Sequence, residues 1–541
     1  MNLGEAIIKK ISDSGIDVAF GIPGGGTSND LLYYMDKYDV NFVLTQNETT
    51  AAIMASVVGE VTKKPGIVVA DLGPGALQLT TGLAYALLDR SPMIAITDRY
   101  GHNQVDYALR QKIWHNDVFK PVTKLSGTIS KQNWNHMLNR GYRVATTPNY
   151  GSVHFDIPND IIREDVEIPI EVDFPDNDFR LTADDRHVTQ AVNLIEKANY
   201  PVIIVGAGIN VGNGEQYEKL KSFVYEWGIP VFKTSKSKGT FPDSDDYSLG
   251  VFMGGKLESK VLDKCDLIVA IGLDPVELLP KKWEYPHDIV SISSVPNNEE
   301  MYTTNTEVVG DIAFSLDLIN DQMHTSSNKW TKRDILEYRD FVLEKLHTNV
   351  DGLTPNDVVF ISQEILPEDT IMTADVGASK LIVAQLWKAE YPHSFFMSNG
   401  LATMGFALPA AMALQHIYPN RTVASLTGDG GFLMRAQEIA SAVQFKWPVI
   451  QIIFSDGRLS LMDVKQRTKG YDKEVGNEFV APNYIKLAES YGANGWSVSS
   501  KDELRDALKQ ALSSTNGMPN IIEAKINPEA YHGQFKAIRD L

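Results

Sequence analysis

The chain has 541 residues, of which 43% are hydrophobic and 22% charged, and its formal net charge is −19. This length predicts roughly three or four domains, and the composition is ordinary for globular cores. The excess of acidic groups argues against nucleic acid or an anionic membrane as the main partner. The single cysteine, Cys265, excludes an internal disulfide and a cysteine-based metal cluster.

The first residues, Met1 to Ser12, have the pattern of a capped amphipathic helix and lack the basic and apolar regions of a signal peptide. No uninterrupted apolar run approaches the roughly 20 residues that span a membrane. We therefore expect a cytoplasmic protein without a membrane partner.

Short apolar runs alternate with helical patterns through a first block, 1–165. The runs that predict strands are 18–20, 42–45, 66–70 and 92–97, and a helix is predicted at 49–61. Such alternation predicts a parallel sheet that is covered by helices on both faces. The acidic, proline-bearing stretch 163–185 is predicted to be a linker.

The same alternation continues in a second block, 186–325, and a third block, 350–541. In the second block, strands are predicted at 201–205, 230–234 and 267–271, and polar residues at 323–328 suggest another linker. The first and third blocks look alike at this level. The predicted fold class is therefore α/β, with three doubly wound parallel-sheet domains at 1–165, 186–325 and 350–541.

The third block contains two carboxylates at the ends of predicted strands. Asp429 follows the apolar run 423–426 and Asp456 follows the run 449–454, with a helical pattern between them. The apolar face of that helix is expected to comprise Phe432, Ala436, Ile439 and Val443. Such a βαβ unit places both strand ends at one edge of a sheet, where open α/β sheets bind ligands. Either motif alone is an ordinary turn signal, but together they suit a divalent cation that carries a diphosphate.

The segment from Gly428 to Gly457 resembles the thiamine-diphosphate motif of the decarboxylase and acetolactate synthase superfamily. That motif opens with Gly-Asp-Gly and usually ends in Asn-Asn, whereas this chain reads Ser455-Asp456. Asp is a competent oxygen ligand for Mg²⁺, so the metal site is retained. Further stretches match in family order at 21–25, 73–76, 89–92, 156–158 and 400–411. The resemblance implies a pyrimidine-binding, a central and a diphosphate-binding domain, in that order.

Glu48 is the second anchor of the resemblance. By itself it would be an ordinary first-turn helix glutamate. In the family, a glutamate at this place bonds the pyrimidine ring of thiamine diphosphate and drives it to the imino form that deprotonates the thiazolium carbon. Burial should raise the pKa of Glu48 and allow proton sharing near neutrality. The resemblance further implies that Met404 separates the two cofactor rings.

The resemblance implies the following site residues. The cofactor thiamine diphosphate would contact Pro23, Gly24, Gly25, Glu48, Gly73, Ala402, Met404, Gly428, Asp429, Gly430, Gly431, Leu461 and Met462. The ligands of Mg²⁺ would be Asp429, Asp456 and the backbone carbonyl of Arg458. Glu48 and Gln111 are the expected catalytic residues, and Gly26, Arg110, Gln111 and Lys465 the expected substrate contacts.

The expected substrate pocket departs from that of the acetolactate synthases. They usually carry Phe-Gln-Glu where this chain has Arg110-Gln111-Lys112, a lysine at Asn159 and a tryptophan at Lys465. These departures do not favour acetolactate itself as the product. If Arg110 and Lys465 both face the pocket, they suit a 2-oxo acid with an additional carboxylate, phosphonate or sulfonate. Alternatively, both are solvated surface cations.

Several alternatives stay open at this stage. The main hypothesis is a carboligase that decarboxylates a 2-oxo acid and transfers the acyl carbanion to a carbonyl acceptor. A simple decarboxylase, which releases an aldehyde, is the alternative. A nucleotide-binding oxidoreductase that uses the turn 206–208 would leave Glu48 and the paired carboxylates unexplained, and a non-catalytic relative is a third possibility.

The resemblance also has implications for flavin binding and for the oligomeric state. The family often holds FAD in its central domain, but the stretch 272–277 here carries acids where a basic group would face phosphate, so FAD is not expected. In the family, the first block of one chain meets the third block of another. We therefore expect a homodimer as the minimum and a homotetramer as the assembly.

Overall fold

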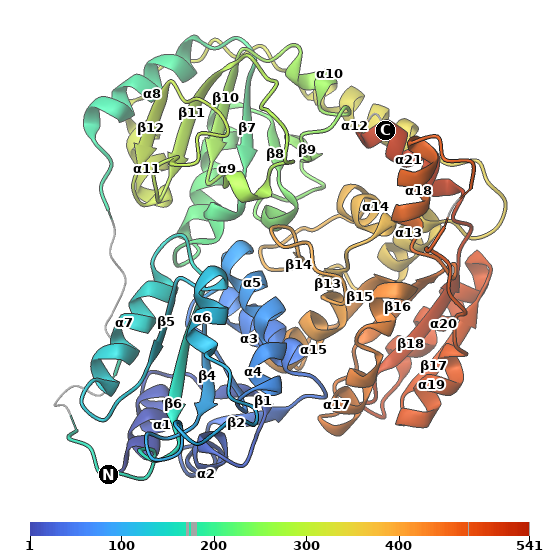
Figure 1. The fold of residues 1–541 in the computed structure, drawn as a ribbon. Helices are drawn as coiled ribbons and strands as arrows, with labels where there is room; N and C mark the ends of the chain where they lie inside the picture. The colour runs from blue at the N-terminus through green and yellow to red at the C-terminus, as the bar shows by residue number, and fades with distance from the viewer. Residues whose placement is uncertain (169–172, 175–180, 474, 540–541) are drawn as a thin grey trace. The chain divides into compact units, whose positions relative to one another are not determined.

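The computed structural model describes residues 1–168, 173–174, 181–473 and 475–539. They form three six-stranded sheets in which all paired strands are parallel, each with helices packed against it (Figure 1). The predicted α/β class is thereby confirmed. The chain divides into two compact units. The first comprises 1–178, 400–419 and 435–445, and the second comprises 179–399, 420–434 and 446–541. Within these ranges, 169–172, 175–180, 474 and 540–541 lie outside the described residues.

The first sheet has the strand order β2-β1-β3-β4-β6-β5. Its strands are β1 (Val18–Ile22), β2 (Asn41–Leu44), β3 (Gly66–Ala70), β4 (Met93–Arg99), β5 (Leu125–Thr128) and β6 (Ser152–Pro158). The helices of this block are α1 (Leu3–Asp13), α2 (Thr27–Lys37), α3 (Glu48–Thr62), α4 (Pro74–Gln78), α5 (Thr80–Leu88), α6 (His115–Phe119) and α7 (Trp134–Thr146).

In two helices of this block, an asparagine side chain determines where the helix begins. The side chain of Asn2 accepts a hydrogen bond from the Glu5 amide and caps α1. The side chain of Asn47 likewise caps α3, which therefore begins at Glu48. Because α3 is composed mainly of small and apolar residues, it is buried along most of its length, and it packs against β1, β3 and α5.

The second sheet has the order β12-β11-β10-β7-β8-β9. Its strands are β7 (Pro201–Val205), β8 (Val231–Lys233), β9 (Ser248–Val251), β10 (Leu267–Ile271), β11 (Asp288–Ser293) and β12 (Thr306–Val309). The helices are α8 (Asp185–Lys197), α9 (Glu215–Trp227), α10 (Ser259–Leu262) and α11 (Ile312–Gln322). The predicted linker 163–185 precedes α8, and its residues 169–172 and 175–180 lie outside the described residues.

The third sheet, β14-β13-β15-β16-β18-β17, repeats the strand order of the first. Its strands are β13 (Ile371–Ala374), β14 (Phe395–Met397), β15 (Val423–Gly428), β16 (Ile450–Ser455), β17 (Asn494–Val498) and β18 (Asn520–Lys525). The helices that follow α11 are α12 (Lys332–Leu346), α13 (Pro355–Ile365), α14 (Ala378–Leu386), α15 (Ala407–Ile417), α16 (Asp429–Leu433), α17 (Ile439–Gln444), α18 (Ser460–Thr468), α19 (Tyr484–Tyr491), α20 (Lys501–Ser513) and α21 (Ala530–Arg539).

The helix predicted between Asp429 and Asp456 is interrupted. It comprises α16, a 3₁₀ turn (Ala436–Glu438) and α17. Three of its four predicted apolar contacts, Phe432, Ala436 and Ile439, are buried, whereas Val443 is half-buried. The spacing of these four residues therefore predicted the buried side of the helix, but it did not predict the interruption between α16 and α17.

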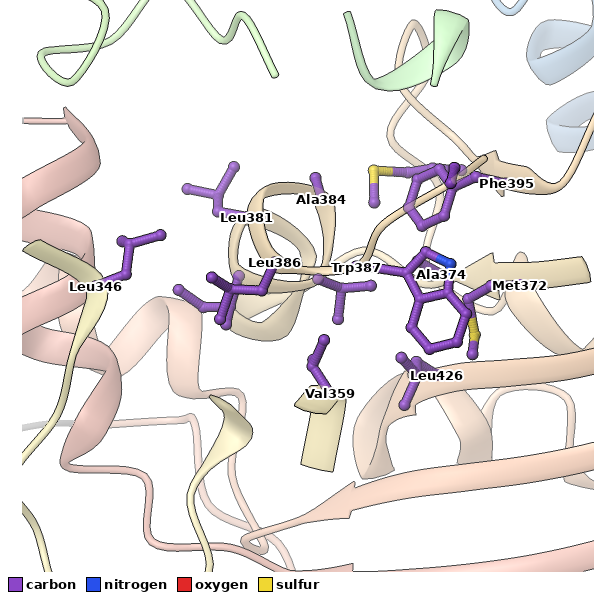
Figure 2. Close-up of a cluster of buried hydrophobic side chains, with 14 of the residues drawn as sticks. Leu346, Val359, Met372, Ala374, Leu381, Ala384, Leu386, Trp387, Phe395 and Leu426 are labelled. Atoms are coloured by element: carbon purple, nitrogen blue, oxygen red, sulfur yellow. The ribbon is translucent and has the colours of Figure 1, made fainter. Parts of the chain in front are cut away.

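One hydrophobic core runs through the second unit. It contains side chains from both the second and the third sheet, such as Ile268 and Leu426. Figure 2 shows the part of this core that contains Trp387 and Met372. Helix α12, which the sequence reasoning did not predict, adds Tyr338 and Leu346 to the same core. Because this core is continuous, the second and third sheets belong to one compact unit.

Candidate active site

In the first unit, Glu48 lies beside the glycine turn that follows β3. A Cβ atom on Gly75 would lie 3.1 Å from Glu48 Oε1, so the absence of a side chain lets this carboxyl group approach the turn. Glu48 is half-buried. Burial, together with the nearby Asp71 carboxylate, raises its pKa above the usual range, as expected for this residue.

Two further carboxyl groups, which the sequence reasoning missed, lie against the loop 23–26 after β1. A Cβ on Gly24 would meet Asp71 Oδ1 at 2.2 Å, and one on Gly26 would meet Asp98 Oδ2 at 2.7 Å. Asp98 accepts hydrogen bonds from the Ser28 amide (2.6 Å) and hydroxyl (2.9 Å). Burial raises the pKa of Asp98 to about 7. Their positions in the sequence could have identified these two residues, because Asp71 directly follows β3 and Asp98 lies at the end of β4.

Gln111 lies against the same glycine turn. Gly73 has a φ of +68°, its amide donates to His115 Nε2 at 3.1 Å, and a Cβ there would meet the Gln111 carbonyl oxygen at 2.9 Å. The structure thus places Gln111, Gly73 and Glu48 around one turn. Within the loop after β1, Pro23 is half-buried and Gly25 is exposed.

Arg110 precedes Gln111 in an exposed loop, 101–114. The Arg110 side chain is exposed, and its backbone carbonyl accepts a hydrogen bond from the Tyr100 hydroxyl at 2.9 Å. The loop also exposes large apolar side chains, including Tyr107 (87%) and Leu109 (90%). Such exposure is unusual for a surface that faces only water.

The loop that contains Ala402 and Met404 belongs to the first unit. Asp89 accepts hydrogen bonds from the amides of Gly400 and Leu401, both at 3.2 Å, and α15 packs against α3. Ala402 is exposed with a φ of +53°, and Met404 is half-buried. These two predicted cofactor contacts therefore lie in the same compact unit as Glu48.

In the second unit, Asp429 and Asp456 meet at the carboxyl ends of the neighbouring strands β15 and β16. Asp429 Oδ2 accepts hydrogen bonds from the amides of Asp456 (3.0 Å) and Gly457 (2.7 Å). Asp456 accepts from the Arg458 amide at 3.1 Å and from the Ser460 hydroxyl. The βαβ geometry expected for this motif is present.

The electrostatics of this pair favour a cation. Burial raises the pKa of Asp429. Burial and the neighbouring Asp429 raise the pKa of Asp456 to about 7. Two carboxyl groups that are removed from water and repel each other gain most from a hard divalent cation, which prefers oxygen ligands.

The turn around Asp429 also suits a diphosphate. A Cβ on Gly428 would meet nothing within 4 Å, so space is open at the strand end, and Gly430 and Gly431 lie in the first turn of α16. Asp375 directly follows the adjacent strand β13 and accepts a hydrogen bond from the Thr427 hydroxyl at 2.9 Å. Asp375 was missed by the sequence reasoning, although its position directly after a strand was a usable signal. The residues present therefore fit a metal-bound diphosphate.

The residues that follow the metal loop are placed by α18. Arg458 forms a bridge with Glu478, with its guanidinium 2.9 Å from the Glu478 carboxylate. Leu461 packs against the core and Met462 is 37% exposed. Lys465 is exposed on the next turn of the helix. Within the described ranges, no group of three or more His, Cys, Asp or Glu residues could hold a metal ion, so a cation here needs other oxygen ligands.

The carboxyl edge of the second sheet is occupied by a side chain of the protein itself. Its strand order reverses between β7 and β10, the point where doubly wound sheets bind dinucleotides. There, Glu277 accepts hydrogen bonds from the Ala207 amide at 2.7 Å and from the Thr234 hydroxyl at 2.5 Å. Loss of water around this carboxyl group raises its pKa to about 7. The turn 206–208 packs tightly, because the Gly208 amide donates to the Gly272 carbonyl at 2.8 Å.

Comparison with known proteins agrees with this arrangement. The family model "Thiamine pyrophosphate enzyme, N-terminal TPP binding domain" matches residues 1–120, the central-domain model matches 188–319, and the C-terminal TPP binding domain model matches 375–524. In the part of the chain that the structure describes, no helix is long and apolar enough to span a membrane.

Named relatives match along almost the whole chain. The "Probable acetolactate synthase large subunit" of Methanocaldococcus jannaschii is 30% identical over 98% of this chain and 92% of the relative. The acetolactate synthase of Bacillus subtilis is 26% identical over 97% and 93%, and the acetolactate synthase large subunit of Corynebacterium glutamicum is 29% identical over 98% and 87%. The predicted resemblance is confirmed: the chain belongs to the thiamine pyrophosphate enzyme family and is an acetolactate synthase-like, thiamine-diphosphate-dependent enzyme.

Proposed function

We propose that this enzyme decarboxylates a 2-oxo acid and transfers the acyl carbanion to a carbonyl acceptor, with Mg²⁺ holding the diphosphate. The observation that carries the proposal is the meeting of Asp429 and Asp456 at one sheet edge beside an open glycine turn. The acetolactate synthase relatives favour carboligation over release of an aldehyde. Membership of this family also removes the nucleotide-binding oxidoreductase as an alternative.

Each half of the proposed site has a separate task. When bound, thiamine diphosphate supplies the nucleophilic carbon and accepts the electrons that the departing carbon dioxide leaves. Asp429, Asp456 and the Arg458 carbonyl would hold Mg²⁺, while the amides of the turn 428–431 would bind the diphosphate. Glu48, with its raised pKa, would hold and return a proton at the pyrimidine ring.

The remaining predicted residues would orient the cofactor and the 2-oxo acid. Pro23, Gly24, Gly25 and Gly73 line the same edge as Glu48, and Met404 would keep the two cofactor rings apart. Gln111 would orient the 2-oxo acid, because it lies against Gly73 in the turn whose Gly75 faces Glu48. Leu461 and Met462 would close the site on the side of α18.

We infer an assembly of at least two copies, and a homotetramer as the expected form. The support is the exposed apolar loop 101–114, in which Tyr107, Leu109 and Trp114 would be covered by a second chain. A cytoplasmic location is proposed as well. Light scattering that shows a fully active monomer would contradict the assembly.

We also propose that the enzyme works without FAD. The support is Glu277, whose carboxylate bonds the Ala207 amide at the point where a nucleotide phosphate would need that donor. Because the Ala207 amide already donates to a carboxyl group of the chain itself, this donor is not available to a phosphate. The purified protein should therefore show no flavin absorbance band.

The proposed reaction is tested by supplying thiamine diphosphate, Mg²⁺ and a panel of 2-oxo acids, and identifying the products. A 2-hydroxy ketone or 2-hydroxy-3-oxo acid is expected, and an aldehyde as the main product would contradict carboligation. Omission of Mg²⁺ should abolish turnover. The variant Asp429→Asn should lose turnover as well, whereas Asp506→Asn, an exposed aspartate on α20, serves as the control.

A further inference from the structure

A cavity of about 760 Å³ in the second unit is lined by positive side chains. Among the described residues, its cations are Lys256, Lys281, Lys465, Lys469 and Arg539, and its one lining acid is Glu284. Glu284 is paired with Lys281 at 2.7 Å. In a chain with a net charge of −19, this concentration of positive groups calls for an explanation.

The cavity is connected to the metal loop by two helices. Helix α18 begins at Ser460, whose hydroxyl bonds Asp456, and Lys465 and Lys469 lie about 8 and 14 Å further along its axis. Helix α21 has Tyr531 near its start, where burial and the nearby Asp456 and Asp429 raise the pKa of the phenol. The same helix ends at Arg539 in the cavity. Lys465, Lys469 and Arg539 therefore lie between one and three helical turns from the part of α18 or α21 that is near the metal loop.

Hydrogen bonds hold one wall of the cavity in place. The Lys256 amide donates to the Ile538 carbonyl at 2.9 Å, and a Cβ on Gly255 would lie 2.2 Å from that oxygen. Buried Glu258 accepts hydrogen bonds from the amides of Met253 (2.6 Å) and Gly255 (3.2 Å). These bonds fix the loop 253–258 against the end of α21.

Several of the cations lack a counter-charge. Among the described residues, no carboxylate lies within ion-pair distance of Lys465, Lys469 or Arg539. Arg539 Nε is buried and has no hydrogen-bond partner in that part of the chain. Burial lowers the pKa of this guanidinium. Positive groups that face one cavity repel one another, and an anion within it would relieve both the repulsion and the unmade hydrogen bond.

We propose that this cavity binds a second anionic group, a carboxylate, sulfonate or phosphonate, on the substrate of the proposed reaction. The group would lie at the end of the substrate remote from the reacting carbonyl. This inference rests on the proposed function and adds the substrate class. Arg110 lies in the other unit and is not part of this cavity.

A matched pair of substrates tests the proposal. 2-Oxovalerate and 2-oxoglutarate differ by a methyl group in place of a carboxylate, and the holoenzyme should prefer 2-oxoglutarate in kcat/KM by about tenfold or more, the value of one charge-assisted hydrogen bond. 3-Sulfopyruvate and 3-phosphonopyruvate show which anion is preferred. In the double variant Lys465→Gln/Lys469→Gln, the ratio of the two kcat/KM values should fall about tenfold. Lys486→Gln, an exposed lysine on α19, is the matched control and should keep the ratio.

A second measurement separates this proposal from the proposed reaction. Glutarate and pentanoate lack the reacting carbonyl, so calorimetric titration into holoenzyme reports on the cavity without turnover. Glutarate should bind, more weakly at high salt and in the double variant, and pentanoate, which has one carboxylate instead of two, should bind more weakly than glutarate. A preference for 2-oxovalerate, or glutarate binding that the double variant leaves unchanged, would overturn the proposal. Absence of turnover with every 2-oxo acid, with glutarate binding still dependent on the lysines, would count against the reaction alone.

Discussion

The first and third sheets have the same strand order but carry opposite chemistry at their carboxyl edges. Around the first edge, burial raises the pKa values of Glu48 and Asp98, so this edge is suited to exchanging protons. At the third edge, Asp429 and Asp456 converge beside backbone amides and an open turn, which suits a metal and a diphosphate. The shared topology brings strand ends together, and a few side chains decide what they bind.

The second sheet extends the comparison. It has a different strand order, and its edge is occupied by Glu277 of the chain itself. Asp98, Glu277 and Asp456 each have a pKa of about 7, because each carboxyl group is withdrawn from water. Burial of an acid therefore does not identify an active site by itself. The partners of the acid, and the space beside it, do.

The largest effect is expected at the proton-exchanging edge. Glu48→Gln removes a proton that the other residues of this edge cannot supply at the same place, so kcat should fall roughly 10²- to 10⁴-fold. Thiamine diphosphate should still bind, because the metal and diphosphate contacts belong to the third sheet. Steady-state kinetics and cofactor retention after gel filtration measure the two parts. Glu167→Gln, an exposed glutamate, is the control, and normal turnover by Glu48→Gln would refute the assignment.

The next effect concerns the metal edge. Asp456→Asn keeps an oxygen ligand but removes a charge, so the affinity for Mg²⁺ should fall by about 10- to 100-fold, with turnover recovered at high Mg²⁺. Titration of activity with Mg²⁺ measures this shift. Equal Mg²⁺ dependence in the variant and in wild type would show that Asp456 is not a ligand.

A smaller effect is expected at the edge of the second sheet. Glu277→Ala leaves the Ala207 amide and the Thr234 hydroxyl without their acceptor, which should cost about 1–3 kcal/mol in the free energy of unfolding. Denaturant unfolding of wild type and variant gives this difference. Glu277→Gln, which keeps an acceptor oxygen, should lose less, and an equal loss would indicate that packing rather than hydrogen bonding matters there.

The last effect is a pH dependence of stability. The pKa of Asp98 is about 7 in the folded protein and 3.8 for the unperturbed group, so the folded state binds more protons between these values. Its contribution to the free energy of unfolding is therefore present at low pH and is lost as pH rises toward 7. Asp98→Asn should remove this part of the slope between pH 5 and 7, measured by unfolding at each pH. An unchanged slope would mean that Asp98 stays ionised.

Local sequence patterns predicted much of the fold. Alternating apolar runs marked β3, β7, β10, β15 and β16, and turn residues marked their ends. The same patterns failed where tertiary packing decides. The break between α16 and α17 has no strong sequence signal, and α12 was missed because its apolar side, with Tyr338 and Leu346, is explained only by the core that it completes. The proposed domain boundaries remain a prediction.

The sequence by itself determined the family, the cofactor and the two carboxylates at the carboxyl edge of the third sheet, because these depend on residue types at fixed spacing. It also placed Glu48 at the start of a helix. Only the tertiary structure showed that Asp71 and Asp98 surround the loop after β1, that Glu277 fills the edge of the second sheet, and that Lys465 joins four other cations around one cavity. These contacts join residues far apart in the chain, and no local pattern encodes such distances.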